Sequence, residues 1–248
     1  MTVRIPDPGA VAALLAESGA ENSRAPGATA PCDEVSSLEV RWIFRGGLEP
    51  AVAGWFGRFP ARTESREDTY RMDPRQHGLS VKIRGNGALE VKAYRGSHGI
   101  LEIPGRARGH IQAWCKWSFP VGLTHLGRSP ARWRQVSKKR RLSRFVLASG
   151  EIVAYAPELR QQPGCCVELT EICAQGQDWW SLGFEATGPG DLLRSELSAT
   201  ATLVFAHPVP TVEPGTDDFA SYAQWLARVT DNPRLLSPPA GNAPGSSP

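Results

Sequence analysis

Hydrophobic and polar residues alternate with a period of two along several short stretches of the chain. In residues 37–45 the even positions are all apolar and the odd positions are mostly charged. Because successive side chains of a β-strand point to opposite faces, this stretch is a strand with one apolar and one charged face. Residues 79–84 and 89–94 repeat this design on either side of a Gly-Asn-Gly turn, whose glycines tolerate the positive φ of a tight reversal. These two stretches predict an antiparallel hairpin.

The rest of the chain adds further short strands and a few helices. A Gly/Pro/Arg-rich loop is predicted between the hairpin and the strand that starts at His110. A helix after Gly190 is predicted to have Asp191 as its cap. The remaining predicted strands are 63–72, 110–120, 133–148, 151–157, 165–172 and 179–188, and the predicted helices are 48–59, 190–205 and 216–229.

The count of about eight strands, mostly in a meander, indicates the fold class. Sheets of that size commonly close on themselves. We therefore predict an α+β protein built on a closed antiparallel β-barrel, or tunnel, with flanking helices. The predicted organisation is a flexible N-terminal tail at 1–35, a barrel domain at 36–207, and a C-terminal helix with a disordered tail at 208–248.

Composition narrows the class of protein. The chain has 248 residues, of which 41% are hydrophobic and 21% charged, as in ordinary globular domains. It contains no apolar run of the ~20 residues that a membrane span requires and no basic-then-apolar leader pattern, so no membrane association and a cytoplasmic location are expected. The five cysteines show no CxxC spacing, which predicts reduced structural thiols.

Charge is clustered although the formal net charge is only +3. The whole molecule is therefore not a polycation of the kind that coats nucleic acid. A basic cluster between 128 and 144 is either an anion site or a solvated strand face. It consists of Arg128, Arg132, Arg134, Lys138, Lys139, Arg140, Arg141 and Arg144.

The charged faces of the predicted strands have two interpretations. They could meet water, as the exposed face of an antiparallel sheet commonly does. They could instead line the inside of the barrel, which would explain why the same two-faced design recurs on several strands. Cations on such a wall would bind phosphate oxygens, and carboxylates would hold a divalent ion that bridges the same phosphates. The second interpretation is preferred here.

Six segments carry a resemblance to a known family. They are SLEVRWIFRG, EDTYRMD, GLSVKIRG, LEVKAYRG, VELTEI and LGFEATG. In order and spacing they resemble the CYTH-like, triphosphate tunnel superfamily over about residues 37–188, as a divergent bacterial member would. That superfamily includes adenylyl cyclases, thiamine triphosphatases, tripolyphosphatases and RNA triphosphatases. The resemblance implies a basic β-tunnel that acts on phosphorylated substrates with Mg²⁺ or Mn²⁺.

The resemblance also implies roles for individual residues. Glu39 matches the second acid of the family's ExExK motif, Arg41 matches its cation, and Ser37 replaces its first acid. Glu39 and Glu185 would be catalytic through the metal that they hold. The implied metal ligands are Glu39, Glu185 and either Glu168 or Glu171. The implied substrate ligands are Arg41, Lys82, Arg84, Lys92, and Lys138 with Arg140, or Lys139 with Arg141 if the register differs by one.

Three functions follow as hypotheses. The first is a metal-dependent phosphohydrolase for a triphosphate or polyphosphate substrate. The second is a protein of the same fold that binds a phosphorylated small molecule without turnover, which the missing acid at Ser37 favours. The third is an RNA-binding module that uses the basic cluster on its outside. Trp114, Trp117, Trp179 and Trp180 are assigned to the core rather than to base stacking.

Overall fold

The computed structural model describes residues 33–72, 78–85, 87–119, 133–148, 151–156 and 163–231. Three features predicted from the sequence lie outside these residues. They are the N-terminal tail before Asp33, the tail from Pro238 onward, and the part of the basic cluster that contains Arg128 and Arg132. The division into three segments therefore stays a prediction.

Within the described residues, nine strands form one sheet with antiparallel ladders. They are β1 (Asp33–Arg45), β2 (Arg62–Arg71), β3 (Leu79–Arg84), β4 (Leu89–Ile103), β5 (Ala107–Phe119), β6 (Trp133–Ala148), β7 (Glu151–Tyr155), β8 (Gly164–Ala174) and β9 (Gln177–Thr187).

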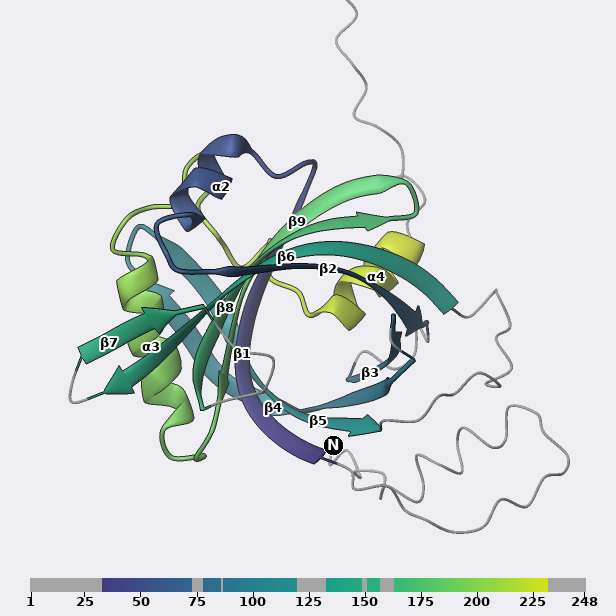
Figure 1. Ribbon diagram of the computed structural model, residues 1–248, viewed down its shortest axis with the longest axis horizontal. Helices are drawn as coiled ribbons and strands as arrows, with labels where there is room; N and C mark the ends of the chain where they lie inside the picture. Colours follow the sequence, from purple (N-terminus) through teal and green to yellow (C-terminus); the bar gives the residue numbers. More distant parts are fainter. Residues whose placement is uncertain are drawn as a thin grey trace, which may run out of the picture.

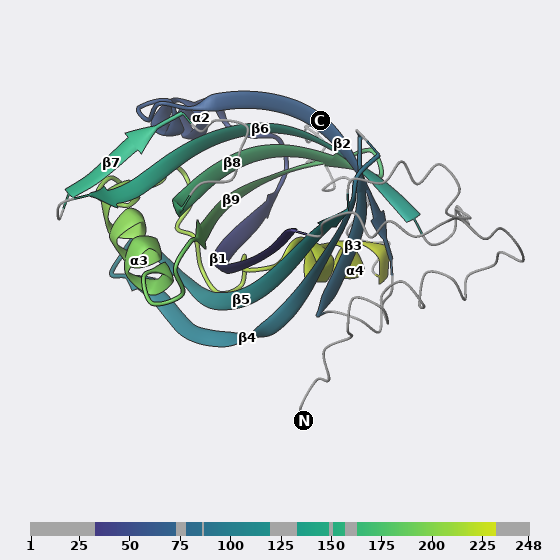
Figure 2. The same ribbon diagram turned by 60° about the horizontal axis from the view of Figure 1, so that its bottom comes forward.

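The sheet closes into a barrel (Figures 1 and 2). Its strand order is β2-β3-β4-β5-β1-β9-β8-β6-β7, and β2 also pairs with β6, so eight of the described strands form the ring. The long strand β6 makes this possible because its first part pairs with β2 and its last part pairs with β7. The predicted closed antiparallel barrel is confirmed.

Two expectations about the strands need correction. The predicted loop after the hairpin is largely strand: β4 continues to Ile103, with register shifts between Tyr94 and Gly96 and between Ser97 and Ile100. Such bulges bend a strand without ending it. Glycine is common at bulges as well as in loops, so the glycines of this segment suggested a loop. The barrel is also only partly a meander, because β1 lies between β5 and β9.

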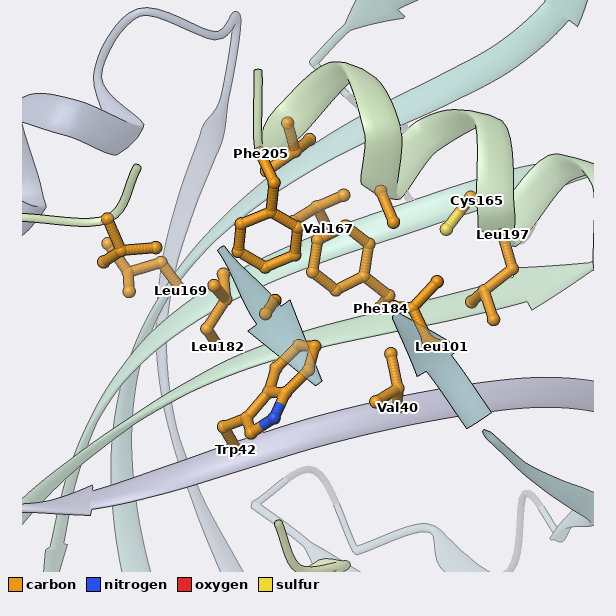
Figure 3. Close-up of a cluster of buried hydrophobic side chains, with 14 of the residues drawn as sticks. Val40, Trp42, Leu101, Cys165, Val167, Leu169, Leu182, Phe184, Leu197 and Phe205 are labelled. Atoms are coloured by element: carbon orange, nitrogen blue, oxygen red, sulfur yellow. The ribbon is translucent and has the colours of Figure 1, made fainter. Parts of the chain in front are cut away.

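The outer face of the barrel is apolar where helices cover it. The even positions of β1 from 38 to 44, Val40 and Trp42 among them, are buried beneath α2 (Pro50–Phe56) and α3 (Leu193–Val204). Figure 3 shows Trp42, Phe184 and Phe205 meeting in this cluster. The apolar faces therefore point outward into a core, and the charged faces point inward.

The start of α3 differs from the prediction. Its N-cap is Leu192, without a side-chain hydrogen bond, so Asp191 is not the cap. Leu192 instead donates its backbone N–H to the Pro189 carbonyl, at 3.0 Å. This turn before the helix sets the first residue of α3 two positions beyond Asp191.

The last helix, α4 (Tyr222–Asp231), packs inside one end of the barrel. Ser221 caps it, accepting a hydrogen bond from the Gln224 backbone N–H at 3.2 Å, while the Gln224 side chain accepts one from the Ser221 N–H at 2.9 Å. The inner-face residues Ile43 and Trp179 pack with the helix. That end of the barrel interior is therefore apolar.

Two other predictions concern membranes and thiols. None of the helices in the described part of the chain is long and apolar enough to cross a membrane. The described cysteines are free thiols, namely Cys115, Cys165, Cys166 and Cys173.

Candidate functional site

The inward side chains of the barrel line a cavity of about 110 Å³. Every ring strand contributes at least one residue, and the start of α4 closes one side. The lining residues are Glu39, Arg41, Arg66, Tyr70, Ser80, Lys82, Arg84, Glu90, Lys92, Gln112, Trp114, Lys116, Lys138, Arg140, Glu168, Glu185, Ser221, Tyr222 and Ala223.

The cavity has an excess of positive charge. Eight basic and four acidic side chains line it. Asp68 is fully buried behind this lining and adds one more acid. The excess is therefore about three positive charges inside a protein whose formal net charge is +3. Cations on low-dielectric walls attract anions more strongly than the same cations in open water.

Lys92 lies between two carboxylates. Glu39 on β1 and Glu185 on β9 are directly opposite each other in the ladder. The Lys92 ammonium contacts Glu39 and lies 3.8 Å from Glu185. Ser37 donates a hydrogen bond of 2.6 Å to the same Glu39 oxygen. Burial lowers the pKa of Lys92, but the two carboxylates outweigh burial and raise it, so the ammonium stays charged.

Glu168 on β8 is held by two arginines. Arg41 approaches one of its oxygens at 3.2 Å, and Arg140 binds the other through Nε at 3.0 Å and through a second nitrogen. Thr170 donates a further bond of 2.6 Å. Burial would raise the pKa of Glu168, but the two guanidinium groups hold it well below its usual range. Glu168 is therefore an ionised carboxylate whose main role is to position two cations.

A glycine on the inner face makes room for one of these cations. A Cβ at Gly183 would lie 2.6 Å from the guanidinium carbon of Arg41. Gly183 is the ladder partner of Arg41 across β1 and β9. The absence of a side chain there lets the Arg41 side chain lie flat against β9.

Lys138 is the most enclosed cation of the site. Its ammonium lies 3.2 Å from Asp68, 2.5 Å from the Tyr70 hydroxyl and 3.7 Å from the centre of the Tyr222 ring. Burial lowers its pKa well below the ordinary value, against the attraction of Asp68. Burial would raise the pKa of Asp68, but Lys82, Lys138 and other cations lower it to about 2.

The hairpin of β3 and β4 supplies further charged residues to the cavity. Lys82 lies 2.8 Å from Glu90 and 3.6 Å from Asp68. Arg84 contacts the other oxygen of Glu90, and its side chain is 34% exposed toward solvent. Burial lowers the pKa of Lys82 to about 8, although Glu90 and Asp68 oppose the shift. The hairpin's charged face therefore lies inside the barrel, in accord with the preferred interpretation of the sequence.

The alternative basic pair lies on the other face of the sheet. Lys139 and Arg141 point outward, where both approach Glu171, at 3.6 Å and 3.1 Å. Lys138 and Arg140 line the cavity instead. The structure thus selects the Lys138 and Arg140 register and places Glu168, but not Glu171, beside the other predicted site residues.

Several cavity residues were missed from the sequence. Arg66, Asp68 and Tyr70 occupy alternate positions of β2 and all face inward or lie just behind the lining. Their shared parity within residues 62–71 was the available signal. Glu90 lies on the charged face predicted for residues 89–94, where alternation alone gives it no role. Tyr222 comes from a helix whose position inside the barrel the sequence does not indicate.

The tryptophans considered for base stacking are buried. Trp114 donates its indole N–H to Gln112 at 3.2 Å, and Trp180 stacks on Phe44 with ring centres 4.2 Å apart. Trp179 packs edge-to-face on Trp225 of α4. The packing of Trp179 and Trp180 agrees with the structural role assigned from the sequence, whereas Trp114 is buried but also lines the cavity.

The residues do not fit the divalent metal that the resemblance implies. Among the described residues, no group of three or more histidine, cysteine, aspartate or glutamate side chains is placed to hold a metal ion. Glu171 faces outward, Glu168 is bound by Arg41 and Arg140, and Lys92 occupies the position between Glu39 and Glu185. A Mg²⁺ or Mn²⁺ ion binds carboxylates whose charge is available to it. Glu39, Glu168 and Glu185 are each paired with a cation of the protein itself.

Comparisons with known proteins concern the fold. No protein-family model and no curated sequence matches the chain. Similar solved structures include the PH1819 protein from Pyrococcus horikoshii, with a TM-score of 0.44, 13% identity, and coverage of 77% of this chain and 98% of that chain. A conserved hypothetical protein from Pyrococcus furiosus has a TM-score of 0.35 and 15% identity, covering 75% and 98%.

Another similar structure is Pct1 RNA triphosphatase of S. pombe in complex with the Spt5 CTD, with a TM-score of 0.36, 10% identity, and coverage of 82% of this chain and 84% of that chain. The eight-stranded antiparallel barrel implied by the sequence resemblance is present in this protein. Membership of the superfamily and a bacterial source stay predictions.

Proposed function

We propose that this protein binds a linear anion with several phosphoryl groups, such as a triphosphate or polyphosphate, in the barrel cavity. The observation that carries the proposal is the excess of inward cations. These cations come from β1, β2, β3, β4, β5 and β6, so they surround the cavity instead of forming one patch. An anion with charge spread along its length would meet several of them at once, which a single phosphate would not.

The internal ion pairs support this proposal by holding the cations in place. Glu168 fixes Arg41 and Arg140, while Glu90 fixes Lys82 and Arg84. A cation that is already oriented loses less side-chain entropy when a ligand arrives. Guanidinium groups also match phosphate oxygens with two parallel hydrogen bonds. The paired acids thus lower the net charge of the cavity but favour a preformed anion site.

Metal-dependent hydrolysis, the first hypothesis from the sequence, has less support. Its metal would need Glu39, Glu185 and Glu168, and all three contact cations of the protein. We therefore favour binding without metal-dependent turnover. The RNA-binding hypothesis is also less favoured, because Lys138 and Arg140 face inward and the outward Lys139 and Arg141 are paired with Glu171.

The test is a calorimetric titration of the full chain with tripolyphosphate in the presence of EDTA, compared with orthophosphate. We expect tripolyphosphate to bind at least about tenfold more tightly, a difference of about 1.4 kcal/mol. Equal affinities for the two anions, or no binding of either, would overturn the proposal. A parallel phosphate-release assay with Mg²⁺ and Mn²⁺ is expected to show no turnover. Release that disappears in Glu39→Gln would establish the enzyme instead.

A further inference from the structure

The carboxylates of Glu39 and Glu185 form a pair that requires a cation. They are direct ladder partners on β1 and β9, on the inner face of the barrel. Side chains directly opposite each other in an antiparallel pair have Cβ atoms about 5 Å apart, and two like charges at that separation destabilise the sheet. When both are ionised, two adjacent acids inside a barrel are stabilised by a positive charge close to both.

Lys92 supplies that charge from a strand that is not adjacent to either acid. It belongs to β4, where its ladder partner is Lys116 of β5, and β5 in turn pairs with β1. The Lys92 side chain crosses the inner face of β5 to contact Glu39 and to lie 3.8 Å from Glu185. The Lys92 side chain is 25% exposed, and its ammonium has Glu39 and Glu185 on one side and the centre of the Trp114 ring 5.7 Å away.

We infer that Lys92 is a built-in substitute for a divalent cation at the Glu39 and Glu185 pair. Its ammonium bridges both carboxylates, as a bound Mg²⁺ or Mn²⁺ would. A metal ion held by both carboxylates would occupy the space in which the Lys92 ammonium lies. Ser37 also donates a hydrogen bond of 2.6 Å to the Glu39 oxygen that Lys92 contacts. The Lys92 ammonium and a metal ion therefore cannot occupy the site between Glu39 and Glu185 at the same time.

The position of Lys92 also affects how an anion would bind in the cavity. With a resident ammonium at this position, the cavity receives its anion without a divalent ion to bridge it. Anion binding is then independent of metal, and a metal site exists only when the ammonium is removed. This consequence rests on the proposed function, whereas the exclusion of the metal by Lys92 does not.

Titration with Mn²⁺ alone tests the inference, with free Mn²⁺ followed by electron paramagnetic resonance and protein melting followed in parallel. In Lys92→Met the methionine retains the length of the side chain but not its charge, which leaves the two carboxylates unpaired. We expect Lys92→Met to bind Mn²⁺ at least tenfold more tightly than the wild type and to be stabilised against melting by it. A folded Lys92→Met without this gain would overturn the inference.

Three further variants complete the design. Lys116→Met removes a lysine from the same cavity, one strand away, and is expected to gain no Mn²⁺ site. Lys92→Met combined with Glu39→Gln is expected to lose the gain. Lys92→Arg retains the cation and is expected to remain as inert to Mn²⁺ as the wild type.

Two other results would overturn the inference even if Lys92→Met could not be measured. Wild-type protein that binds Mn²⁺ and loses that binding in Glu39→Gln would overturn it, as would a Mn²⁺ site in Lys92→Arg, even if Lys92→Met does not fold. No anion is present in these titrations. Their failure is therefore distinguishable from failure of the tripolyphosphate titration, which would overturn the proposed function alone.

Discussion

Four consecutive basic residues of β6 are divided between two different environments. The side chains of Lys138 and Arg140 are 1% and 13% exposed and line the cavity, whereas those of Lys139 and Arg141 are 53% and 23% exposed on the outer face. All four lie near carboxylates. Residue type and pairing are therefore the same on both faces, and only the parity of the position differs.

The face on which a charged residue lies determines its role in this barrel. An ion pair at the surface is screened by water and salt and contributes about 0–1 kcal/mol. A buried pair is costly to form, and removal of one partner leaves an uncompensated charge in a low dielectric. The inner residues should therefore control both stability and anion binding, while their outer neighbours should control neither. Each prediction below compares an inner residue with an outer one.

The largest effect is expected from Asp68 on β2, the fully buried partner of Lys138. Asp68→Asn leaves Lys138 and Lys82 without their shared carboxylate, and we expect it to reduce the free energy of unfolding by about 3–5 kcal/mol. The control is Glu67→Gln, one position away, where the carboxylate makes exposed hydrogen bonds and the expected change is within about 0.5 kcal/mol. Urea denaturation measures both. Equal losses would contradict the inner and outer distinction.

The next effect concerns anion affinity. Arg140→Ala removes a guanidinium from the cavity wall, and we expect tripolyphosphate binding to weaken by about 10- to 100-fold, because a hydrogen bond to a charged group is worth about 1.5–3 kcal/mol. Arg141→Ala should change the affinity by less than about twofold, since its charge lies outside the barrel. Calorimetry with both variants decides the point. A stronger effect of Arg141 would place the anion on the outer surface.

Lys82 should contribute one step to the pH dependence of anion binding. With its pKa lowered to about 8, Lys82 is charged below that pH and becomes neutral above it, so anion affinity should fall as the pH rises past about 8. The fall is at most about tenfold per pH unit. Because the folded pKa lies below the unfolded value of 10.5, the folded state loses the proton first, and stability should rise between about pH 8 and 10.5.

The matched variants for this prediction are Lys82→Arg and Lys139→Arg. The ratio of wild-type to Lys82→Arg affinity cancels the titration of the ligand itself and should fall above about pH 8. The ratio of wild-type to Lys139→Arg affinity should stay constant over the same range. A constant ratio for Lys82→Arg would show that Lys82 does not contact the anion.

The smallest expected effect is an increase in tripolyphosphate affinity. Glu168→Gln retains the shape of the side chain but releases Arg41 and Arg140 from a negative charge, so we expect tripolyphosphate to bind a few-fold more tightly. Stability should fall in the same variant, because two buried guanidinium groups lose their carboxylate. Glu171→Gln on the outer face should leave both quantities unchanged. Weaker binding in Glu168→Gln would argue that Glu168 contacts the ligand itself.

The two-faced strands were predictable from the sequence because their apolar faces are uninterrupted. The even positions of residues 38–44 and the hairpin residues Val81 and Ile83 mark one face of each strand without ambiguity. The closed barrel and the inward direction of Lys82 and Lys92 followed from repetition of that pattern. The same argument does not reach Arg66 and Asp68, because neither face of residues 62–71 is apolar.

The register of β6 was not predictable in the same way. Four basic residues in a row carry no alternation, and the inner face of β6 also holds apolar residues such as Val136. The interior at that end is apolar because α4 packs into it, so Ile43 and Trp179 interrupt the charged faces of their strands. Helix placement depends on contacts distant in sequence, and local periodicity does not contain them.

The contact of Lys92 with Glu39 and Glu185 is the feature that is hardest to predict from the sequence. Lys92 is on β4, which β5 separates from β1 and β9, where the two acids lie. The contact therefore depends on the curvature of the closed barrel. Family resemblance assigned these residues to phosphate and metal. In the structure Lys92 is paired with Glu39 and Glu185.

The most direct test of the central claim is a crystal structure of the wild-type protein with tripolyphosphate in the presence of EDTA. We expect electron density for the anion inside the barrel, within hydrogen-bond distance of Lys82 on one wall and Arg140 on another. Density on the outer face beside Lys139 and Arg141, with an unoccupied cavity, would contradict the claim.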